Sequence, residues 1–275
     1  MSTATLSQPG PSGSSGQVAG RVSPREAISH ALTVMRRNLL HIRSDPEQLV
    51  GMTVQPLMFL MLFVFVFGGA IAGSSGAYLQ FALPGILVQG IAFTGFQTAL
   101  GLNVDFQRGL IDRFRSLPIS RSAVVGGRIM ADTVRVVWGV VIIVGFGMLL
   151  GFRFHGGLAG GVGALALAAL FGVTVCWPMA FIGVSAKSPE SVNTGGFLLI
   201  LPLTFASSVF APPSSMPGWL QAFVKVNPIT KVVDATRGLM LGGAVGRPLW
   251  QALAWMAAIT AVFAPLAVSR YRRRV

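Results

Sequence analysis

The sequence predicts an all-α integral membrane protein, and three features carry that prediction: low charge, high hydropathy and long windows without charge. Charged residues make up only 11% of the 275 residues and hydrophobic residues 53%, whereas soluble domains carry about 25% charged residues. The mean hydropathy is +0.70. Such a chain cannot cover a surface that faces water, so we expect most of it to lie in a lipid bilayer.

The charge-free windows predict how many helices cross the membrane. Four windows contain no Asp, Glu, Lys or Arg: residues 48–104, 154–186, 191–224 and 248–269. A helix needs roughly 20 apolar residues to cross a bilayer, and the first window is long enough for two helices separated by the turn-forming GSSG at 73–76. A further apolar stretch precedes Arg153. We therefore predict six spans, near residues 50–72, 79–103, 129–151, 158–184, 192–210 and 249–269.

The basic residues predict the orientation of these spans. Fifteen Lys and Arg residues fall in segments on the side of the N-terminus, and five fall on the other side. Cytoplasmic loops are enriched in Lys and Arg, so we expect a cytoplasmic (inner or plasma) membrane protein with both termini in the cytoplasm. The terminal RYRRR then meets anionic lipid. The net charge of +13 therefore does not require a nucleic acid partner, and none is expected.

Two segments precede the first predicted span. Residues 1–22 are rich in Ser, Gly and Pro and predict a disordered tail. Residues 23–44 open with Ser23, Pro24 and Glu26, which match a capping box, and continue with apolar residues at helical spacing. This pattern predicts an amphipathic helix in the inner membrane interface. A short soluble helix packed on protein is the alternative.

The connection between predicted spans two and three has the pattern of a short docking helix. Its apolar residues follow one another at steps of four, four and three, which places them on one face: Phe106, Leu110, Phe114 and Leu117. Arg108, Asp112 and Arg115 lie on other faces, and Pro118 ends the helix. The pattern suits a contact with a partner protein. A solvated loop with positive-inside charge is the alternative.

One ionisable pair lies at the start of predicted span three. Asp132 and Arg135 are three residues apart, so they can pair on one helix face. Charged groups at this depth are costly unless they are paired or reach the interface. We expect a structural intramembrane pair, and a role in transport is the alternative.

The segment before the last span is broken by prolines and cannot cross a bilayer. The breaks are at Pro212, Pro213, Pro217 and Pro228. Between them, 218–226 and 229–243 have the pattern of half-length amphipathic helices, the second closed by Gly242 and Gly243. Trp219 suits an anchor in the interface. Irregular backbone at membrane depth must be buried in protein or face a water-filled cavity, so we predict re-entrant half-helices on the outer face.

The sequence lacks the motifs of catalysis and of nucleotide binding. GxxxxGK[ST], GxSxG and HExxH are absent, and the three histidines do not have the spacing of metal ligands. The single cysteine, Cys176, lies inside a predicted span and suits an apolar filler. We expect no enzyme activity, no cofactor and no metal in this chain. Any ATP and Mg²⁺ must be bound by a separate subunit.

Over roughly residues 24–275 the chain resembles the ABC-2 family of ABC-transporter permeases, in particular its daunorubicin-resistance branch. Three stretches carry the resemblance: RFRSLPISRSAVVGGRIMADTVR, GFRFHGG and PGWLQAFVKVNPITKVVDATRGLMLGG. The resemblance implies that residues 45–275 form a six-span permease domain, preceded by an elbow helix. It also implies a second permease copy, identical or a sister chain, and a separate ABC ATPase. Its cargo would be a hydrophobic or amphipathic drug or a complex lipid, exported with ATP.

The same resemblance assigns roles to particular residues. The coupling helix that meets the ATPase would hold Arg108, Asp112, Arg113, Phe114, Arg115, Leu117 and Pro118. The extracellular gate region would hold Trp219, Asn227 and Pro228. Spans two and five would line the export path, and the polar residues Asn193 and Thr204 in span five are its first candidates.

Other functions stay open at this point. An exporter of polysaccharide or glycolipid has the same framework, and a proton-coupled secondary transporter would also consist mainly of apolar helices. A membrane enzyme that acts on lipids would need an acid–base cluster or nucleophile, which the sequence lacks. A scaffold or sensor without transport activity is the remaining class.

Overall fold

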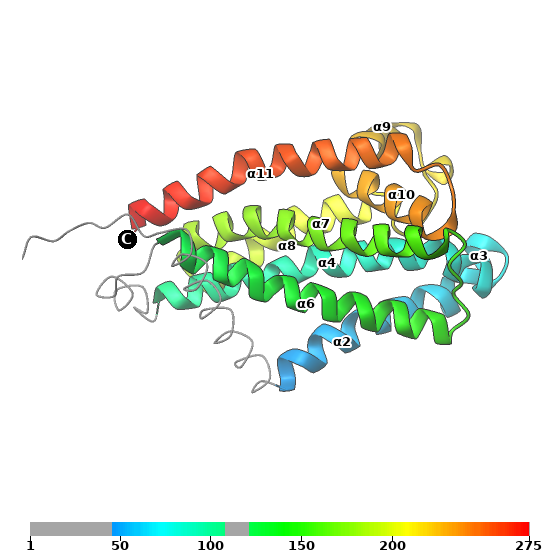
Figure 1. The fold of residues 1–275 in the computed structure, drawn as a ribbon, viewed down its shortest axis with the longest axis horizontal. Helices are drawn as coiled ribbons and strands as arrows, with labels where there is room; N and C mark the ends of the chain where they lie inside the picture. The colour runs from blue at the N-terminus through cyan, green and yellow to red at the C-terminus, as the bar shows by residue number, and fades with distance from the viewer. Residues whose placement is uncertain (1–45, 108–120, 275) are drawn as a thin grey trace, which may run out of the picture.

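The computed structural model describes residues 46–107 and 121–274, and the regular structure within these ranges is helical (Figure 1). The longer helices are α2 (Pro46–Met61), α4 (Ser75–Gln107), α6 (Arg121–Leu149), α7 (Gly157–Ser185), α8 (Pro189–Phe205) and α11 (Gly246–Arg274). The shorter ones are the π-helix η1 (Leu62–Phe67), α3 (Gly68–Ala72), the 3-10 turn η2 (Pro213–Ser215), α9 (Gly218–Val226) and α10 (Pro228–Leu241). The all-α class is confirmed.

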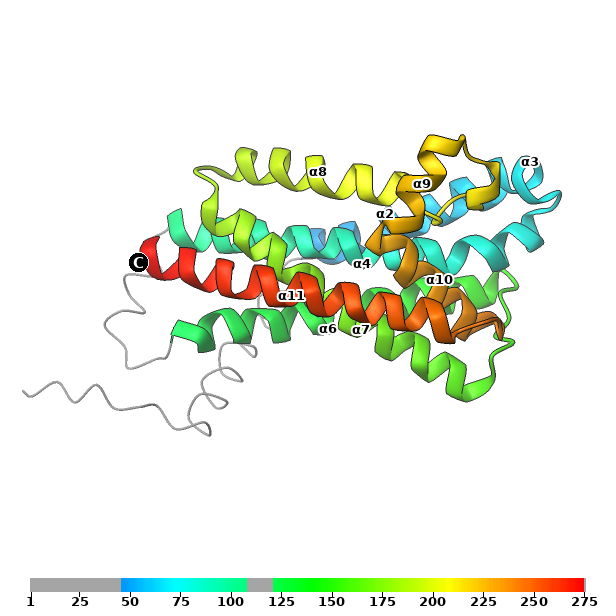
Figure 2. The ribbon, with the colours of Figure 1, turned by 90° about the horizontal axis from the view of Figure 1, so that it is seen from above.

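The long helices run side by side along one axis (Figures 1 and 2). One end of the bundle, which we call the C-terminal end, contains the end of α4, the start of α6, the α7–α8 connection and the end of α11. The opposite end, which we call the α10 end, contains the α3–α4 and α6–α7 connections together with α9 and α10. Helix α4 contacts α2, α6, α7, α8 and α10, so it is the centre of the bundle.

Helix α4 is central because it is apolar on all sides and carries small residues where other segments cross it. A helix without a polar face is buried by its neighbours. Gly85 lets the backbone of Val209 approach: a Cβ added there would lie 2.5 Å from the Val209 carbonyl oxygen. On α7, Gly183 lies against the backbone of Ala99, where a Cβ would overlap the carbonyl oxygen. Small residues at helix crossings allow such close packing in membrane proteins.

Four of the predicted spans coincide with helices that are long and apolar enough to cross a membrane. Within the described residues these are Val54–Ala72, Ser75–Gln107, Gly157–Ser185 and Gly246–Tyr271. The span predicted near 129–151 falls in α6, whose apolar part, Arg135–Leu149, is shorter. The span predicted near 192–210 begins as α8 but ends at Phe205. The six-span layout therefore stays a prediction, and the predicted segments 1–22 and 23–44 lie outside the described residues.

Two predicted glycine turns are confirmed. The GSSG turn separates α3 from α4, and Gly73 has a φ of +74°, a left-handed conformation that favours glycine. Helix α10 ends at Gly242, which has a φ of +76° and donates its backbone N–H to the carbonyl of Gly238. This is the αL cap that the sequence predicts for the second half-helix.

We expect Gly183→Ala to destabilise the contact between α4 and α7, because its methyl group would overlap the Ala99 backbone rather than a movable side chain. Overpacking of this kind costs about 1–3 kcal/mol. The measurement is the thermal unfolding of the purified protein in mild detergent. Gly145→Ala on α6 is the control, because no atom lies within 4 Å of its Cβ position. Equal melting temperatures for the two variants would contradict this packing.

Candidate functional site

The residues predicted for ATPase coupling lie outside the described residues, but the helices on both sides of them are described. Helix α4 ends at Gln107 and α6 begins at Arg121, both at the C-terminal end of the bundle. The predicted contact segment therefore connects to the central helix α4.

The last turn of α4 is tied to the connection between α7 and α8. The Asn103 side-chain amide donates to the carbonyls of Gly183 at 3.1 Å and Ala186 at 2.9 Å. Gln107 donates to the Asn103 side-chain oxygen at 3.2 Å and to the Lys187 carbonyl at 3.3 Å. These bonds satisfy carbonyls at the end of α7 that have no partner within that helix. The last turn of α4 is thus joined to the end of α7 and to the connection that leads into α8.

This joint, made by the bonds of Asn103 and Gln107 to the α7–α8 connection, was not predicted from the sequence. Its signal was an amide residue, Asn103, at the end of a long charge-free window, with a second amide, Gln107, four residues later on the same helix face. The Phe106 ring also packs edge-on against Tyr271, with ring centroids 5.3 Å apart. The end of α11 is therefore attached to the same joint.

At the α10 end, the predicted half-helices are present as α9 and α10, and Asn227 joins them to α8. Asn227 is buried, and its amide donates to the carbonyls of Leu203 and Ala206, both at 2.7 Å. Its side-chain oxygen accepts from the backbone N–H of Ile229 at 2.8 Å, which caps α10. Asn227 thus satisfies two carbonyls at the end of α8 and also caps the first turn of α10.

The two other predicted gate residues differ in their surroundings. Pro228 is the first residue of α10, where its missing N–H costs nothing. Trp219 lies on α9 and is 76% exposed. An exposed tryptophan at a helix near the bundle end suits the membrane interface.

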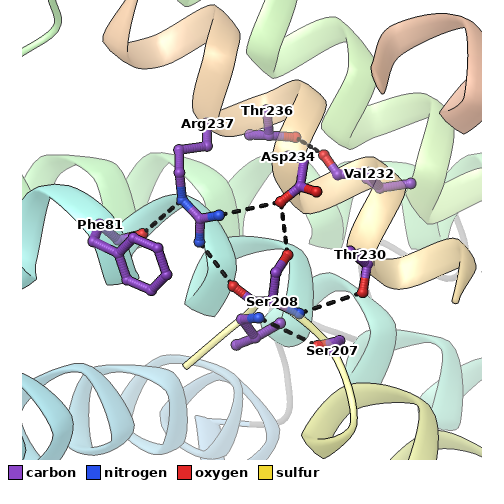
Figure 3. A network of polar contacts seen from close by, with 9 residues as sticks. Phe81, Ser207, Ser208, Thr230, Val232, Asp234, Thr236 and Arg237 are labelled. Carbon is purple, nitrogen blue, oxygen red and sulfur yellow. Dashed lines mark hydrogen bonds and ion pairs between the residues drawn. The ribbon is translucent and has the colours of Figure 1, made fainter. Parts of the chain in front are cut away.

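Arg237 is the centre of a polar network beside α10 (Figure 3). Its guanidinium donates to the carbonyl of Phe81 on α4 at 3.1 Å and to the carbonyl of Ser208 at 2.9 Å. It also pairs with Asp234 one turn earlier, at 3.2 Å. The Arg237 Cζ atom lies 3.9 Å from the centroid of the Phe81 ring, which adds a cation–π contact. One side chain therefore links α4, α10 and the irregular segment that follows α8.

The other hydrogen bonds of the network hold Ser208 against α10. Its hydroxyl donates to Asp234 at 2.7 Å, and its backbone N–H donates to the Thr230 hydroxyl at 3.3 Å. Burial lowers the pKa of Arg237 to about 10, although Asp234 and Tyr78 favour its charged form. The guanidinium is still charged at neutral pH. The sequence analysis counted Arg237 only as an outer basic residue and missed this role.

The far end of α10 docks on the connection between α6 and α7. The backbone N–H groups of His155 and Gly156 donate to the Met240 carbonyl at 2.9 and 3.0 Å. A Cβ at Gly156 or Gly160 would overlap the carbonyl oxygen of Leu239, so glycine is needed for this approach. Two of the stretches that carry the family resemblance, GFRFHGG and ITKVVDATRGLMLGG, are therefore in direct contact.

The predicted path residues and the predicted ion pair have different surroundings. On α8, Asn193 is exposed, whereas Thr204 is fully buried and its hydroxyl has no hydrogen-bond partner among the described residues. Arg135 is buried at the start of the apolar part of α6. The side chain of Asp132 lies outside the described part of the chain, so the pair stays a prediction. The described residues contain no cluster of His, Cys, Asp and Glu that could hold a metal ion.

Comparison with known proteins places the chain among membrane transporters. Residues 30–241 match the family described as ABC-2 type transporter. The daunorubicin resistance ABC transporter permease protein of Streptomyces coeruleorubidus is 40% identical over 90% of this chain and 88% of its own length. A probable doxorubicin resistance ABC transporter permease protein of Mycobacterium tuberculosis is 30% identical over 88% of this chain and 89% of its own. A putative transport permease of Cyanophora paradoxa is 30% identical over 77% and 74%.

We expect Arg237→Met to destabilise the protein strongly. The substitution keeps most of the volume but leaves the carbonyls of Phe81 and Ser208 without their donor, and an unsatisfied buried group costs about 1–3 kcal/mol. The thermal melting temperature in detergent is the measurement. Arg247→Met is the control: this residue is exposed, and such substitutions are usually within about 0.5 kcal/mol. A melting temperature for Arg237→Met that equals the control would exclude a structural role for the network.

Proposed function

Because this chain belongs to the ABC-2 type transporter family, we propose that it moves hydrophobic or amphipathic drug-like molecules, of the daunorubicin type, out across the cytoplasmic membrane. The observation that carries the proposal is the 40% identity to a daunorubicin resistance permease over nearly the full length of both chains. The relative from Mycobacterium tuberculosis, named for doxorubicin resistance, supports the same class of cargo.

The chain supplies the membrane part of this exporter and a partner supplies the energy. Its 275 residues contain no phosphate-binding GxxxxGK[ST] motif. We propose that a separate ABC ATPase binds ATP and Mg²⁺ and contacts this chain through the segment from Arg108 to Pro118, whose residue spacing predicts an apolar face with Phe114 and Leu117. A second permease copy completes the assembly. The excess of basic residues in the N-terminal-side segments supports an arrangement with both termini in the cytoplasm.

The joint at the end of α4 supports a mechanical route for the transport cycle. When the ATPase closes on ATP, the coupling segment moves with it and displaces the last turn of α4. The bonds of Asn103 and Gln107 then carry the displacement to α7 and α8. At the α10 end, Asn227 and Arg237 join α8, α10 and α4, so the same helices act on the gate region. The cycle opens the complex to the inside and to the outside in turn.

The proposal predicts ATP-dependent accumulation of daunorubicin in inside-out vesicles that contain this chain and its ATPase. Daunorubicin fluorescence is quenched as the drug accumulates, so uptake can be followed directly. We expect uptake to stop when the ATPase carries a substitution of its phosphate-binding lysine, and to continue in the presence of an uncoupler. Uptake that stops with the uncoupler but does not need ATP would favour a proton-coupled carrier instead.

A second prediction tests the coupling segment. We expect Phe114→Ala combined with Arg115→Ala to weaken recovery of the ATPase in a detergent pull-down at least tenfold, which corresponds to a loss of about 1.4 kcal/mol. ATP-driven uptake should fall with it, while the amount of permease in the membrane stays the same. Arg270→Ala is the control, because it removes a basic residue that lies at the C-terminal end but outside the coupling segment. Full pull-down and uptake by the double variant would exclude these contacts.

A further inference from the structure

Between α2, α4 and α6 the protein has a partly open cleft of about 250 Å³. Its walls are apolar and aromatic, with Phe59 from α2, Phe93 from α4 and Ile143 from α6. Three glutamines also line it: Gln55 on α2, and Gln89 and Gln97 on α4. A cleft with apolar walls and a few polar groups is the usual composition of a small-molecule site.

Gln89 is the unusual residue of the cleft. It is 4% exposed, and its side-chain oxygen has no hydrogen-bond partner among the described residues. Other amide side chains of α4 are satisfied: Gln80 donates to the Gly151 carbonyl and accepts from the Arg153 backbone, and Asn103 donates to two carbonyls. Buried polar groups are nearly always paired, so an unpaired one that lines a cleft indicates a missing donor.

The position of Gln89 along α4 makes the unpaired oxygen costly. At about 1.5 Å per residue, Gln89 lies ~21 Å from the start of α4 and ~27 Å from its end. It is therefore near the middle of a helix that is long enough to cross a membrane. Water is scarce in the apolar core of a bilayer. A bound molecule that brings its own donor can supply the hydrogen bond.

We propose that this cleft binds the transported molecule, and that it takes a planar aromatic compound with a hydroxyl or amine group that donates to the Gln89 side-chain oxygen. The phenylalanines supply faces for ring stacking, and the unpaired Gln89 side-chain oxygen selects for a donor. The inference rests on the proposed function for the identity of the ligand as cargo, but the site itself rests on the cleft and Gln89. The described residues that line the cleft come from α2, α4 and α6, and the ring centroid of one of them, Phe93, also lies 6.3 Å from that of Phe197 on α8. The cleft therefore shares only α4 with a path between spans two and five.

The cleft was not predicted from the sequence, although the residues that α4 contributes to it form a recognisable pattern. On α4 they recur at helical spacing: Ile86, Gln89, Gly90, Phe93, Thr94 and Gln97. That stripe carries two glutamines in a charge-free window, which was the available signal. Gly90 keeps the wall open at its centre, since a Cβ there would lie 3.3 Å from the Ile143 side chain and 3.9 Å from Pro56.

The test uses the full chain with its ATPase in nanodiscs and two probes that differ by one hydroxyl group, 2-hydroxyanthraquinone and anthraquinone. Wild-type protein should bind the hydroxyl probe about fivefold to tenfold more tightly, the range expected for one hydrogen bond. Gln89→Leu should remove this preference. It should also raise the melting temperature without ligand by roughly 2–4 °C, because it removes an unsatisfied polar group.

Gln80→Leu is the matched control, because it has the same residue type on the same helix but its amide is already paired. It should lower the melting temperature and leave the preference for the hydroxyl probe unchanged. A Gln89→Leu variant that melts as low as Gln80→Leu would show that Gln89 is a structural residue and overturn the proposal. Wild-type protein that binds both probes equally, or neither, would also overturn it.

The outcome is separable from that of the transport experiment, because probe binding needs neither ATP nor transport. If the hydroxyl preference depends on Gln89 but daunorubicin is not transported, the site stands and the cargo assignment is wrong. If wild-type protein shows no preference for the hydroxyl probe and Gln89→Leu transports daunorubicin as well as the wild type, the exporter stands and the site is wrong.

Discussion

The arrangement of this protein depends on the hydrogen bonds that Arg237 makes to backbone outside its own helix. The chain leaves helical geometry after α8, and carbonyls such as that of Ser208 then lack a helical partner. In apolar surroundings an unsatisfied carbonyl is costly, and lipid cannot satisfy it. The guanidinium reaches this carbonyl and that of Phe81 while Asp234 balances its charge. An irregular segment is therefore stable beside an otherwise apolar bundle.

Helix α4 is held at both ends by amide and guanidinium groups and has an unpaired amide between them. Gln80 and Arg237 hold the α10 end, and Asn103 holds the C-terminal end. Between these ends Gln89 faces the cleft with α2 and α6. In the proposed transport cycle, a helix held at both ends carries displacement from the proposed ATPase contact at one end to the proposed gate region at the other. A ligand at Gln89 would contact the element that moves.

Local patterns in the sequence predicted much of the fold. Charge-free windows predicted helices at four membrane spans, and the glycine and proline positions predicted the turn at Gly73 and the cap at Gly242. The end of α8 was misplaced because it is set by Asn227, which lies 21 residues beyond Ala206 and takes its carbonyl. The roles of Arg237 and Gln89 depend on which distant backbone or helix faces them. Periodicity along one helix holds no information on that.

The most direct measurement of the central claim is a cryo-electron microscopy structure of the chain with its ATPase and bound daunorubicin, in nanodiscs. We predict ligand density in the cleft between α2, α4 and α6, with a donor within hydrogen-bond distance of the Gln89 side-chain oxygen. The same map should show the segment around Phe114 in contact with the ATPase. Ligand density confined to the contact between two permease copies, with an empty cleft and an unpaired Gln89, would contradict the account.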